Sequence, residues 1–307
     1  MNPKNGEVYA MVSLPDFNPS ALKENWNNIM EDRDSPFLNR ATSGLYAPGS
    51  TFKILTSVGI LNTPDLDKQY KCTGSTKIEG YTLKDYGGKA HGNVNLEEAL
   101  VKSCNSYFAE KGTMVGKDKL GEIADKFMLN KNIPFDLPTA KSSFPYKENL
   151  GKTDIAAASI GQGKVLVTPL NMVMIASGIA NKGEIVKPIL VREAIAPDGS
   201  IVESNYSQVL SKATDVFTAN EIKNMMVEVV NRGTGTNARI KDIRVAGKTG
   251  TAENSSGKTH AWFTGFAPAD DPKIAVVVVL EKDGTTGGKT AAPIARNIMI
   301  EALNTIK

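Results

Sequence analysis

The chain has 307 residues, 41% of them hydrophobic, and a net charge of +3, so it can bury the core of one large domain or about two ordinary ones. Its basic residues are scattered rather than clustered, which argues against a nucleic-acid partner. The longest continuous apolar run, Ile274 to Leu280, is far shorter than the roughly 20 residues needed to span a bilayer. The composition fits a globular enzyme, and we expect no transmembrane segment.

The N-terminal part is predicted to lead from a first strand into a helix. Gly6 to Ser13 has strand character and ends before Leu14-Pro15, because proline cannot donate a ladder hydrogen bond. Residues 16 to 47 are polar and aromatic, and we interpret them as an irregular segment with one short helix. From Pro48 to Asn62 the apolar residues lie close to helical spacing, and Pro48-Gly49 suits a helix start.

The remainder of the chain is predicted to be helical first and strand-like later. The expected helices are Leu96 to Lys111, Lys117 to Phe127, Ile155 to Ile160, Leu170 to Ala180 and Ala219 to Asn231. The last third is expected to form strands at Ile243 to Ala252, Ala261 to Ala267 and Lys273 to Glu281, and a closing helix at Thr290 to Ile306. Consecutive strands with short connections favour antiparallel pairing. The pattern therefore predicts an α/β or α+β fold with a helical insert and a C-terminal antiparallel sheet.

A hydroxyl and an amine lie one helical turn apart at the start of the helix predicted from Pro48. They belong to Ser50-Thr-Phe-Lys53, and a lysine at this spacing shares the helix face of the serine closely enough to take its proton. Backbone N–H groups in the first turn of a helix also favour developing negative charge. The same spacing occurs from Ser20 to Lys23 and from Ser255 to Lys258, so the pair alone does not identify a nucleophile.

A second candidate site is Lys248-Thr249-Gly250, which occurs once, on a strand-like segment, and is followed by Thr251. An ammonium and hydroxyls on a sheet edge could bind a carboxylate, and a glycine lets the ligand lie close to the backbone. The alternative is a turn or strand end without such a role. A phosphate-binding P-loop is disfavoured because Asp242 stands where its first glycine should be and no sustained helix follows.

The third candidate is Ser103-Cys104-Asn105, the sole Ser-x-Asn in the chain. Its hydroxyl and amide could relay a proton and hold a carbonyl, although a polar pair on a helix surface is the alternative. Ser-x-x-Lys, Ser-x-Asn and Lys-Thr-Gly in this order are the signature of penicillin-binding proteins and related β-lactamases. The order selects Ser50, because neither Ser20 nor Ser255 precedes the other two motifs at the start of an apolar helix.

Longer segments resemble the transpeptidase domain of class B penicillin-binding proteins. The resemblance runs from about residue 2 to the last helix. It implies a β-lactamase/transpeptidase-like fold, with a central antiparallel sheet of about five strands flanked by helices and a mainly helical subdomain. The matching segments are Asn2 to Ser13, Pro15 to Pro19, Leu38 to Ala41, Tyr46 to Ser50, Ser159 to Gly163 with Thr168-Pro169, Lys248 to Glu253, and His260 to Pro268.

The resemblance implies that the catalytic residues are Ser50, Lys53, Ser103, Asn105 and Lys248. Ser50 would attack the carbonyl between the two terminal D-alanines of a peptidoglycan stem peptide and release D-alanine, with Lys53 as its base. Ser103 and Asn105 would transfer the leaving-group proton and orient the donor peptide. An amine from a neighbouring stem would then resolve the acyl-enzyme and form the cross-link.

The resemblance also implies how the substrate is held. Lys248, Thr249 and Thr251 would bind the terminal carboxylate, or the ring carboxylate of a β-lactam, and Gly250 would allow close approach. The backbone N–H groups of Ser50 and Thr251 would form an oxyanion hole.

The family further implies the organisation and setting of the chain. We expect a single domain over residues 1–307, with a sheet-bearing part at about 1–65 and 180–307 and a helical insert at about 66–180. Class B members normally carry an N-terminal membrane anchor and a pedestal domain, and we expect neither within residues 1–307. The expected location of the full-length enzyme is the extracytoplasmic face of the bacterial membrane. Its expected partners are stem peptides, β-lactams and a membrane glycan polymerase, with no cofactor.

Three other activities share this chemistry. D,D-carboxypeptidases and β-lactamases also form a serine acyl-enzyme, so the fate of the acyl group separates them from transpeptidases. A class A β-lactamase uses a Glu-x-x-Leu-Asn glutamate to activate water, whereas the nearest segment here, Lys126-Phe-Met-Leu-Asn130, has lysine in its place. A non-catalytic β-lactam sensor is the third alternative.

The few cysteines and histidines give no recognisable site by their spacing. Cys72 and Cys104 show no Cys-x-x-Cys pattern, and with His91 and His260 they do not match a standard zinc spacing. We therefore expect no metal. Because Cys104 lies inside the Ser-x-Asn motif, a Cys72–Cys104 disulfide could distort it as a redox switch, provided that the Cα atoms lie within about 7 Å; two free thiols are the alternative.

Overall fold

The computed structural model describes residues 1–306 of the chain. Its α-helices are α1 (Leu22–Glu31), α2 (Arg40–Ser43), α3 (Lys53–Leu61), α4 (Leu96–Lys102), α5 (Asn105–Val115), α6 (Lys117–Lys126), α7 (Lys152–Ser159), α8 (Pro169–Ala180), α9 (Val216–Arg232) and α10 (Ala291–Thr305). The short 3₁₀ helices are η1 (Pro19–Ala21), η2 (Gly49–Phe52), η3 (Tyr86–Gly88) and η4 (Thr236–Ala238). The strands are β1 (Tyr70–Cys72), β2 (Ser75–Ile78), β3 (Tyr81–Lys84), β4 (Gly92–Val94), β5 (Glu184–Val186), β6 (Glu193–Ile195), β7 (Ile201–Ser204), β8 (Val209–Lys212), β9 (Ala246–Ala252), β10 (His260–Ala267) and β11 (Ile274–Leu280).

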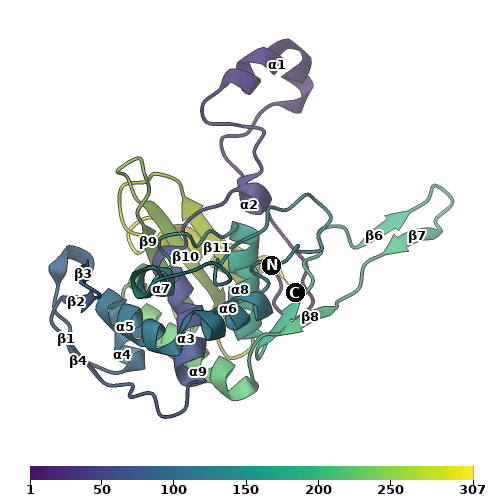
Figure 1. Cartoon of the computed structure of the whole chain (residues 1–307). Coiled ribbons are helices and arrows are strands. Elements are labelled where there is room, and N and C mark those ends of the chain that lie inside the picture. The colour runs from purple at the N-terminus through teal and green to yellow at the C-terminus, as the bar shows by residue number, and fades with distance from the viewer. Residues whose placement is uncertain (307) are drawn as a thin grey trace.

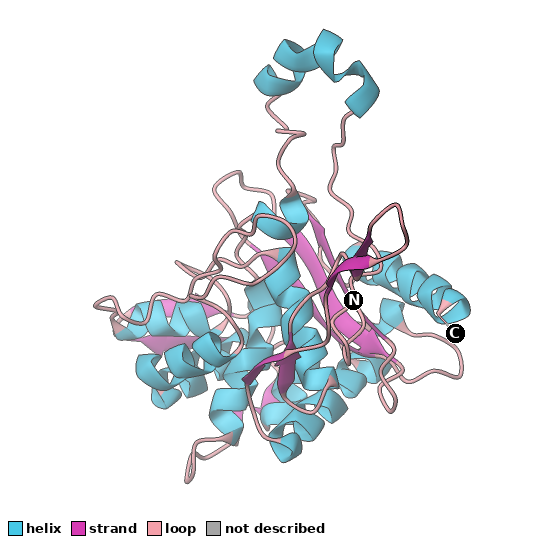
Figure 2. Ribbon diagram, turned by 90° about the vertical axis from the view of Figure 1, so that its right-hand side faces the viewer, coloured by secondary structure: helices cyan, strands magenta, loops and turns pink. Residues whose placement is uncertain are grey.

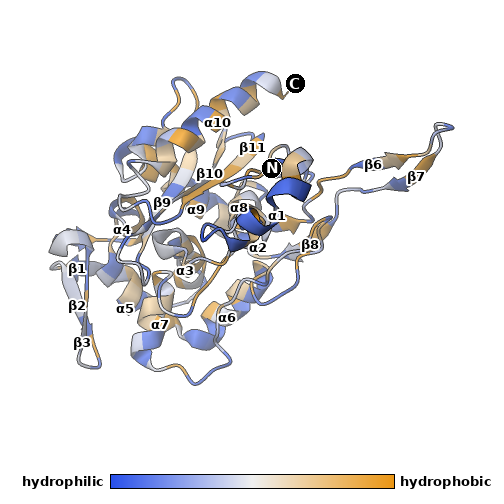
Figure 3. Ribbon diagram, turned by 90° about the horizontal axis from the view of Figure 1, so that it is seen from above, coloured by the Kyte–Doolittle hydropathy of each residue, from blue (hydrophilic) through white to orange (hydrophobic). Residues whose placement is uncertain are grey.

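An antiparallel sheet in the order β11-β10-β9 forms the middle layer of the molecule. Its residues alternate between two hydrophobic clusters, because successive strand side chains point to opposite faces. Phe263 packs with Ala295 and Met299 of α10, whereas the adjacent Trp262 belongs to the larger cluster on the other face. Helices α8 and α9 contact the sheet on that second side, and Figure 3 shows α10 and α8 on opposite sides of the strands.

The larger cluster is built around α3, which contacts α5, α6 and α9. Every residue of α3 from Lys53 to Ile60 is buried, as expected of a helix that is surrounded by other elements on all sides. Helices α4 to α7 gather beside it, and the small strands β1 to β4 lie at the outer edge of this group (Figure 1). The predicted helix from Pro48 therefore forms the centre of the fold, with its N-terminal turn as η2.

The sheet has three long strands where we expected about five. The N-terminal segment pairs with the edge strand β11 only at Met1, which exchanges two backbone hydrogen bonds with Ala275. A turn then closes between Asn2 and Gly6 and directs the chain away from the sheet. The remaining short strands form separate two-stranded sheets within residues 1–306.

The strand predicted at Gly6 to Ser13 is also wrong. Within this segment the described backbone makes a single bridge, between Glu7 and Ile189. Val8 packs against the larger hydrophobic cluster, but Tyr9 and Val12 are 43% and 73% exposed, so the apolar residues do not form a continuous buried face. Composition alone does not make a strand without a partner edge.

The predicted helix from Leu96 to Lys111 is divided in two. α4 ends at Lys102 and α5 begins at Asn105. Ser103 between them has a left-handed backbone with φ 56°, which ends the first helix, and Cys104 Sγ accepts a hydrogen bond from the N–H of Tyr107 as the cap of the second. The break places the Ser-x-Asn motif at a turn rather than on a helix surface.

Two segments extend from the body of the molecule. Helix α1 stands apart on a long connection, and the β6–β7 hairpin projects as an arm (Figure 1). Figure 2 shows the α1 projection above the sheet. None of the helices formed by residues 1–306 combines the length and the apolar character that crossing a bilayer requires.

Candidate active site

The candidate nucleophile lies where η2 runs into α3. Ser50 is half-buried in η2, and Lys53, the first residue of α3, is completely buried. The backbone carbonyl of Ser50 accepts a hydrogen bond from the N–H of Lys53, so the two residues occupy one turn. The other two Ser-x-x-Lys matches fall elsewhere: Ser20 and Ser255 are both exposed.

The α4–α5 turn brings the Ser-x-Asn motif to the lysine of the first motif. Lys53 Nζ donates to the Ser103 carbonyl oxygen at 2.8 Å and to Asn105 Oδ1 at 2.7 Å, and lies 3.4 Å from Ser103 Oγ. The ammonium also lies 5.3 Å from the centre of the Phe108 ring, at cation–π distance. These contacts explain the left-handed Ser103, because that conformation turns both its carbonyl and its hydroxyl toward Lys53.

Strand β9 supplies a second lysine to the same hydroxyl. Lys248 Nζ lies 3.0 Å from Ser103 Oγ and 2.9 Å from the Thr249 carbonyl oxygen. Lys248 is completely buried. Ser103 is thus 50 residues from one lysine and 145 from the other, yet its hydroxyl is within hydrogen-bonding distance of both.

Burial dominates the electrostatics of this lysine pair. Burial lowers the pKa of Lys53 to about 7, while the negative charge of the Asp85 carboxylate acts in the opposite direction. Burial, with a further contribution from the charge of Lys53, lowers the pKa of Lys248 well below its ordinary value. Two ammonium groups on one hydroxyl disfavour each other, so the arrangement favours a neutral amine that can accept a proton near neutral pH.

Close backbone packing sets β9 directly against η2. A Cβ on Gly250 would lie 2.8 Å from the Pro48 carbonyl oxygen, and one on Gly49 would lie 2.8 Å from the Thr251 carbonyl oxygen. Both distances are too short for a side chain, so both positions require glycine. Thr251 and Gly250 therefore lie beside the turn that carries Ser50. Among residues 1–306, β9 pairs only with β10, which leaves its other edge on the Ser50 side.

Three residues at this site were missed by the sequence analysis. Phe108 covers the Lys53 ammonium, and Thr234 Oγ1 lies 2.6 Å from Thr249 Oγ1. Asp85 accepts the N–H of Asn105 at 2.5 Å and a short hydrogen bond from the Ser106 hydroxyl. No sequence motif identifies Asp85 or Phe108 as site residues. Thr234 lies between two glycines, in Gly233-Thr-Gly235, and this pattern indicates a tight turn.

The geometry agrees with a family match over almost the whole chain. A family model described as penicillin binding protein transpeptidase domain matches residues 1–300. The chain belongs to this family. The match confirms the resemblance that the sequence motifs indicated.

Curated relatives of this penicillin-binding transpeptidase domain cover nearly all of it. It is 34% identical, over 99% of its length, to the peptidoglycan D,D-transpeptidase PbpA of Mycolicibacterium smegmatis, of which it covers 66%. It is also 34% identical, over 99% of its length, to the stage V sporulation protein D of Bacillus subtilis, of which it covers 48%. The chain thus spans between about half and two thirds of these relatives.

Solved structures share the fold of this transpeptidase domain. The ceftriaxone acyl-enzyme complex of penicillin-binding protein A from M. tuberculosis has a TM-score of 0.91 and 32% identity, over 98% of this chain and 72% of that one. The D,D-transpeptidase domain of a peptidoglycan glycosyltransferase from Eggerthella lenta has a TM-score of 0.92 and 34% identity, over 99% of this chain and 76% of that one. The predicted fold class is therefore confirmed, with the smaller sheet described above.

Gly161 supports the turn of this transpeptidase domain that carries Ser50, and its replacement is predicted to be costly. Gly161 has φ +73°, its carbonyl accepts the N–H of Gly49 at 2.9 Å, and a Cβ there would lie 2.2 Å from the Gly49 carbonyl oxygen. Gly161→Ala should therefore combine left-handed strain of about 1–2 kcal/mol with an overpacking cost of about 1–3 kcal/mol.

Gly163→Ala is the matched control. Gly163 has nearly the same φ, +72°, but its nearest neighbour, Ala157 Cβ, would be 3.6 Å from the added carbon. Urea unfolding should show a clearly larger loss of unfolding free energy for the change at Gly161. Equal losses would mean that the close contact with Gly49 does not constrain the site.

Proposed function

We propose that this domain is a peptidoglycan D,D-transpeptidase that works through a serine acyl-enzyme and is inhibited covalently by β-lactams. The observation that carries the proposal is the Ser103 hydroxyl, which lies 3.4 Å from Lys53 Nζ and 3.0 Å from Lys248 Nζ. This contact joins the three motifs into one connected set of proton donors and acceptors. The PbpA name of the M. smegmatis relative and the acyl-enzyme complex of the M. tuberculosis protein support it.

Acylation follows from the placement of Ser50 and Lys53. Neutral Lys53 takes the proton of Ser50 Oγ as that oxygen attacks the carbonyl carbon between the two terminal D-alanines. The amide bond breaks, and the leaving nitrogen receives a proton through Ser103, which Lys248 and Lys53 flank. Terminal D-alanine departs, and the remaining peptide is held as an ester on Ser50.

Substrate binding is assigned to β9 and the residues around it. Lys248 and Thr249 attract the terminal carboxylate, and the Thr234 hydroxyl, 2.6 Å from that of Thr249, orients the latter. An extended stem peptide can add to the free edge of β9 as a further strand. Gly250 lets β9 pack against the Pro48 carbonyl beside Ser50, and Asn105, whose side-chain amide is held by Lys53 and the Lys84 carbonyl, orients the peptide.

The oxyanion hole is assigned to the backbone N–H groups of Ser50 and Thr251. Their segments are held together by the glycine contacts between η2 and β9, so both donors belong to a rigid part of the fold. Donors fixed in this way are worth about 3–4 kcal/mol each in related acyl-transfer reactions. After acylation, an amine from a neighbouring stem attacks the ester, which forms the cross-link and frees Ser50.

The surroundings of Asn130 support a slow reaction of the ester with water. In the segment that resembles the β-lactamase glutamate motif, the Asn130 amide donates to Asp125 Oδ1 at 2.8 Å and to the Phe144 carbonyl oxygen at 3.1 Å. These bonds give the asparagine a structural role, and Lys126 offers no general base in place of glutamate. A D,D-carboxypeptidase and a β-lactam sensor remain the second candidates, because both use the same acylation step.

The setting of the full-length protein is proposed from its relatives. Their names assign them to peptidoglycan synthesis and to sporulation, which supports action on the extracytoplasmic face of the cell membrane. We further propose a membrane glycan polymerase as a partner, because a cross-linking enzyme needs newly made strands.

Retention of a bound β-lactam tests the proposal. The purified domain is labelled with a fluorescent penicillin, excess label is removed, and the covalent label is followed over time. We expect about one label per chain, lost only slowly, because Lys126 stands where a class A β-lactamase carries its water-activating glutamate. Release of the label within seconds would identify a β-lactamase instead.

A further inference from the structure

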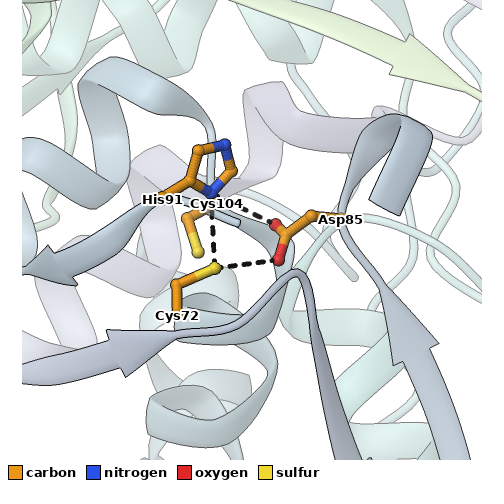
Figure 4. Close-up of side chains that lie close together, drawn as sticks. All are labelled: Cys72, Asp85, His91 and Cys104. Atoms are coloured by element: carbon orange, nitrogen blue, oxygen red, sulfur yellow. Dashed lines mark hydrogen bonds and ion pairs between the residues drawn. The ribbon is translucent and has the colours of Figure 1, made fainter. Parts of the chain in front are cut away.

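Four side chains with metal-binding atoms converge beside the Ser-x-Asn turn. They are Cys72 at the end of β1, Asp85 after β3, His91 before β4 and Cys104 between α4 and α5. The atoms that each would offer to a metal all lie within 4.8 Å of one another. Figure 4 shows the two thiols, the carboxylate and the imidazole facing one another. The transpeptidase mechanism uses none of the four.

Three distances within this cluster lie close to those between the ligand atoms of a tetrahedral zinc ion. With bonds of about 2.3 Å to sulfur and about 2.0–2.1 Å to nitrogen and oxygen, such an ion holds neighbouring ligand atoms about 3.3–3.8 Å apart. Cys72 Sγ lies 3.5 Å from His91 Nδ1 and 3.2 Å from Asp85 Oδ2, and His91 Nδ1 lies 3.8 Å from Asp85 Oδ1. The four groups therefore need only small rotations to coordinate one ion.

The cluster is also enclosed. Cys72, Asp85 and Cys104 are buried, and the His91 side chain is only 10% exposed. Both thiols are free rather than joined in a disulfide. Two sulfurs with an imidazole and a carboxylate are the ligand types that zinc accepts, whereas magnesium and calcium prefer oxygen alone.

We propose that Cys72, Asp85, His91 and Cys104 form a structural zinc site. On binding, the two thiols lose their protons to solvent and two zinc–sulfur bonds form, together with one bond to His91 and one to Asp85. All four coordination positions are then filled by protein, as in structural rather than catalytic zinc sites. Standard spacing did not predict this site, because its ligands come from short strands and a turn that only the tertiary fold brings together.

The ion would fasten the Ser-x-Asn turn to the small strands around it. Asp85 accepts the N–H of Asn105 and Cys104 lies between the two motif residues, so two of the four ligands hold that turn directly. Zinc adds two positive charges and displaces two thiol protons, so the net charge of the cluster stays the same. Zinc is therefore expected to stabilise the geometry around Lys53 without changing the charge that Lys53 experiences.

The test measures zinc in the purified chain and in two variants. The reduced protein is equilibrated with zinc, freed of loosely bound ion, and analysed for metal content and for thermal unfolding with and without a chelator. We expect one zinc per chain and a melting temperature that falls when the chelator is added. His91→Gln and Cys72→Ser should each reduce zinc affinity by at least about tenfold.

His260→Gln is the matched control, because His260 is the other histidine of the chain and its ring contacts Asn254 and Lys282 outside the cluster. This variant should keep its zinc.

Cobalt(II) in the unmodified protein, where folding is not in question, should give the intense sulfur-to-metal absorption of a thiolate site. Full zinc retention in both ligand variants would overturn the proposal. So would a Cys72–Cys104 disulfide in a chain that binds no zinc after reduction, which would favour a redox switch.

Discussion

Replacing Ser50 by alanine is expected to abolish covalent labelling by a fluorescent penicillin. Removal of the hydroxyl deletes the atom that forms the ester, and neither Ser20 nor Ser255 lies in the buried site. The rate of acylation should fall by at least about 10⁴-fold, as for removal of other serine nucleophiles. Gel fluorescence and intact-protein mass measure the loss.

Ser20→Ala provides the matched control for this change. Ser20 has the same spacing to Lys23 as Ser50 has to Lys53, but it lies exposed in η1 outside the site. The control should label at the rate of the unmodified chain. Persistent labelling of the Ser50 variant would show that another residue is the nucleophile.

The acylation rate is expected to rise with pH through about 7 and then to level off. Only neutral Lys53 can take the Ser50 proton, and burial brings the pKa of Lys53 down from 10.5 to about 7. Below that value the rate should fall about tenfold per pH unit, because the neutral fraction does so. The titratable groups around Lys53 include Lys248, Cys104, Asp85 and His91. Stopped-flow labelling across pH 5 to 9 measures their combined effect on the acylation rate.

Lys53→Arg should lower the plateau rate by about 10²–10⁴-fold and remove the midpoint near 7, because a guanidinium stays charged throughout the range. Lys23→Arg, in the exposed Ser-x-x-Lys match, should leave both the rate and the midpoint unchanged. A midpoint near 7 that survives Lys53→Arg would assign the base to another group, with Lys248 as the first to examine.

The parts of the fold set by local pattern were predictable from sequence. The apolar spacing after Pro48 and the three C-terminal strands correspond to α3 and to β9, β10 and β11 within a few residues. In each case the signal comes from apolar residues that lie near one another in the chain. The order of the three motifs likewise identified residues that the fold brings together at Ser103.

The features that sequence did not predict depend on distant partners. Gly6 to Ser13 has strand composition but finds a single bridge, at Glu7. The left-handed Ser103 follows from contacts with Lys53 and Lys248 rather than from any local turn signal. Asp85 is a buried carboxylate whose partners, among them Cys72 and Asn105, lie 13 and 20 residues away. The spacing of residues along the sequence does not predict such contacts.

Incubation with a stem pentapeptide ending in D-alanyl-D-alanine, together with an amine acceptor, tests the central claim most directly. The measured quantities are free D-alanine and the products that retain the donor peptide. A transpeptidase should release one D-alanine for each new amide bond to the acceptor, and Ser50→Ala should form neither product. Release of D-alanine with only the hydrolysed tetrapeptide, or no release at all, would contradict the account.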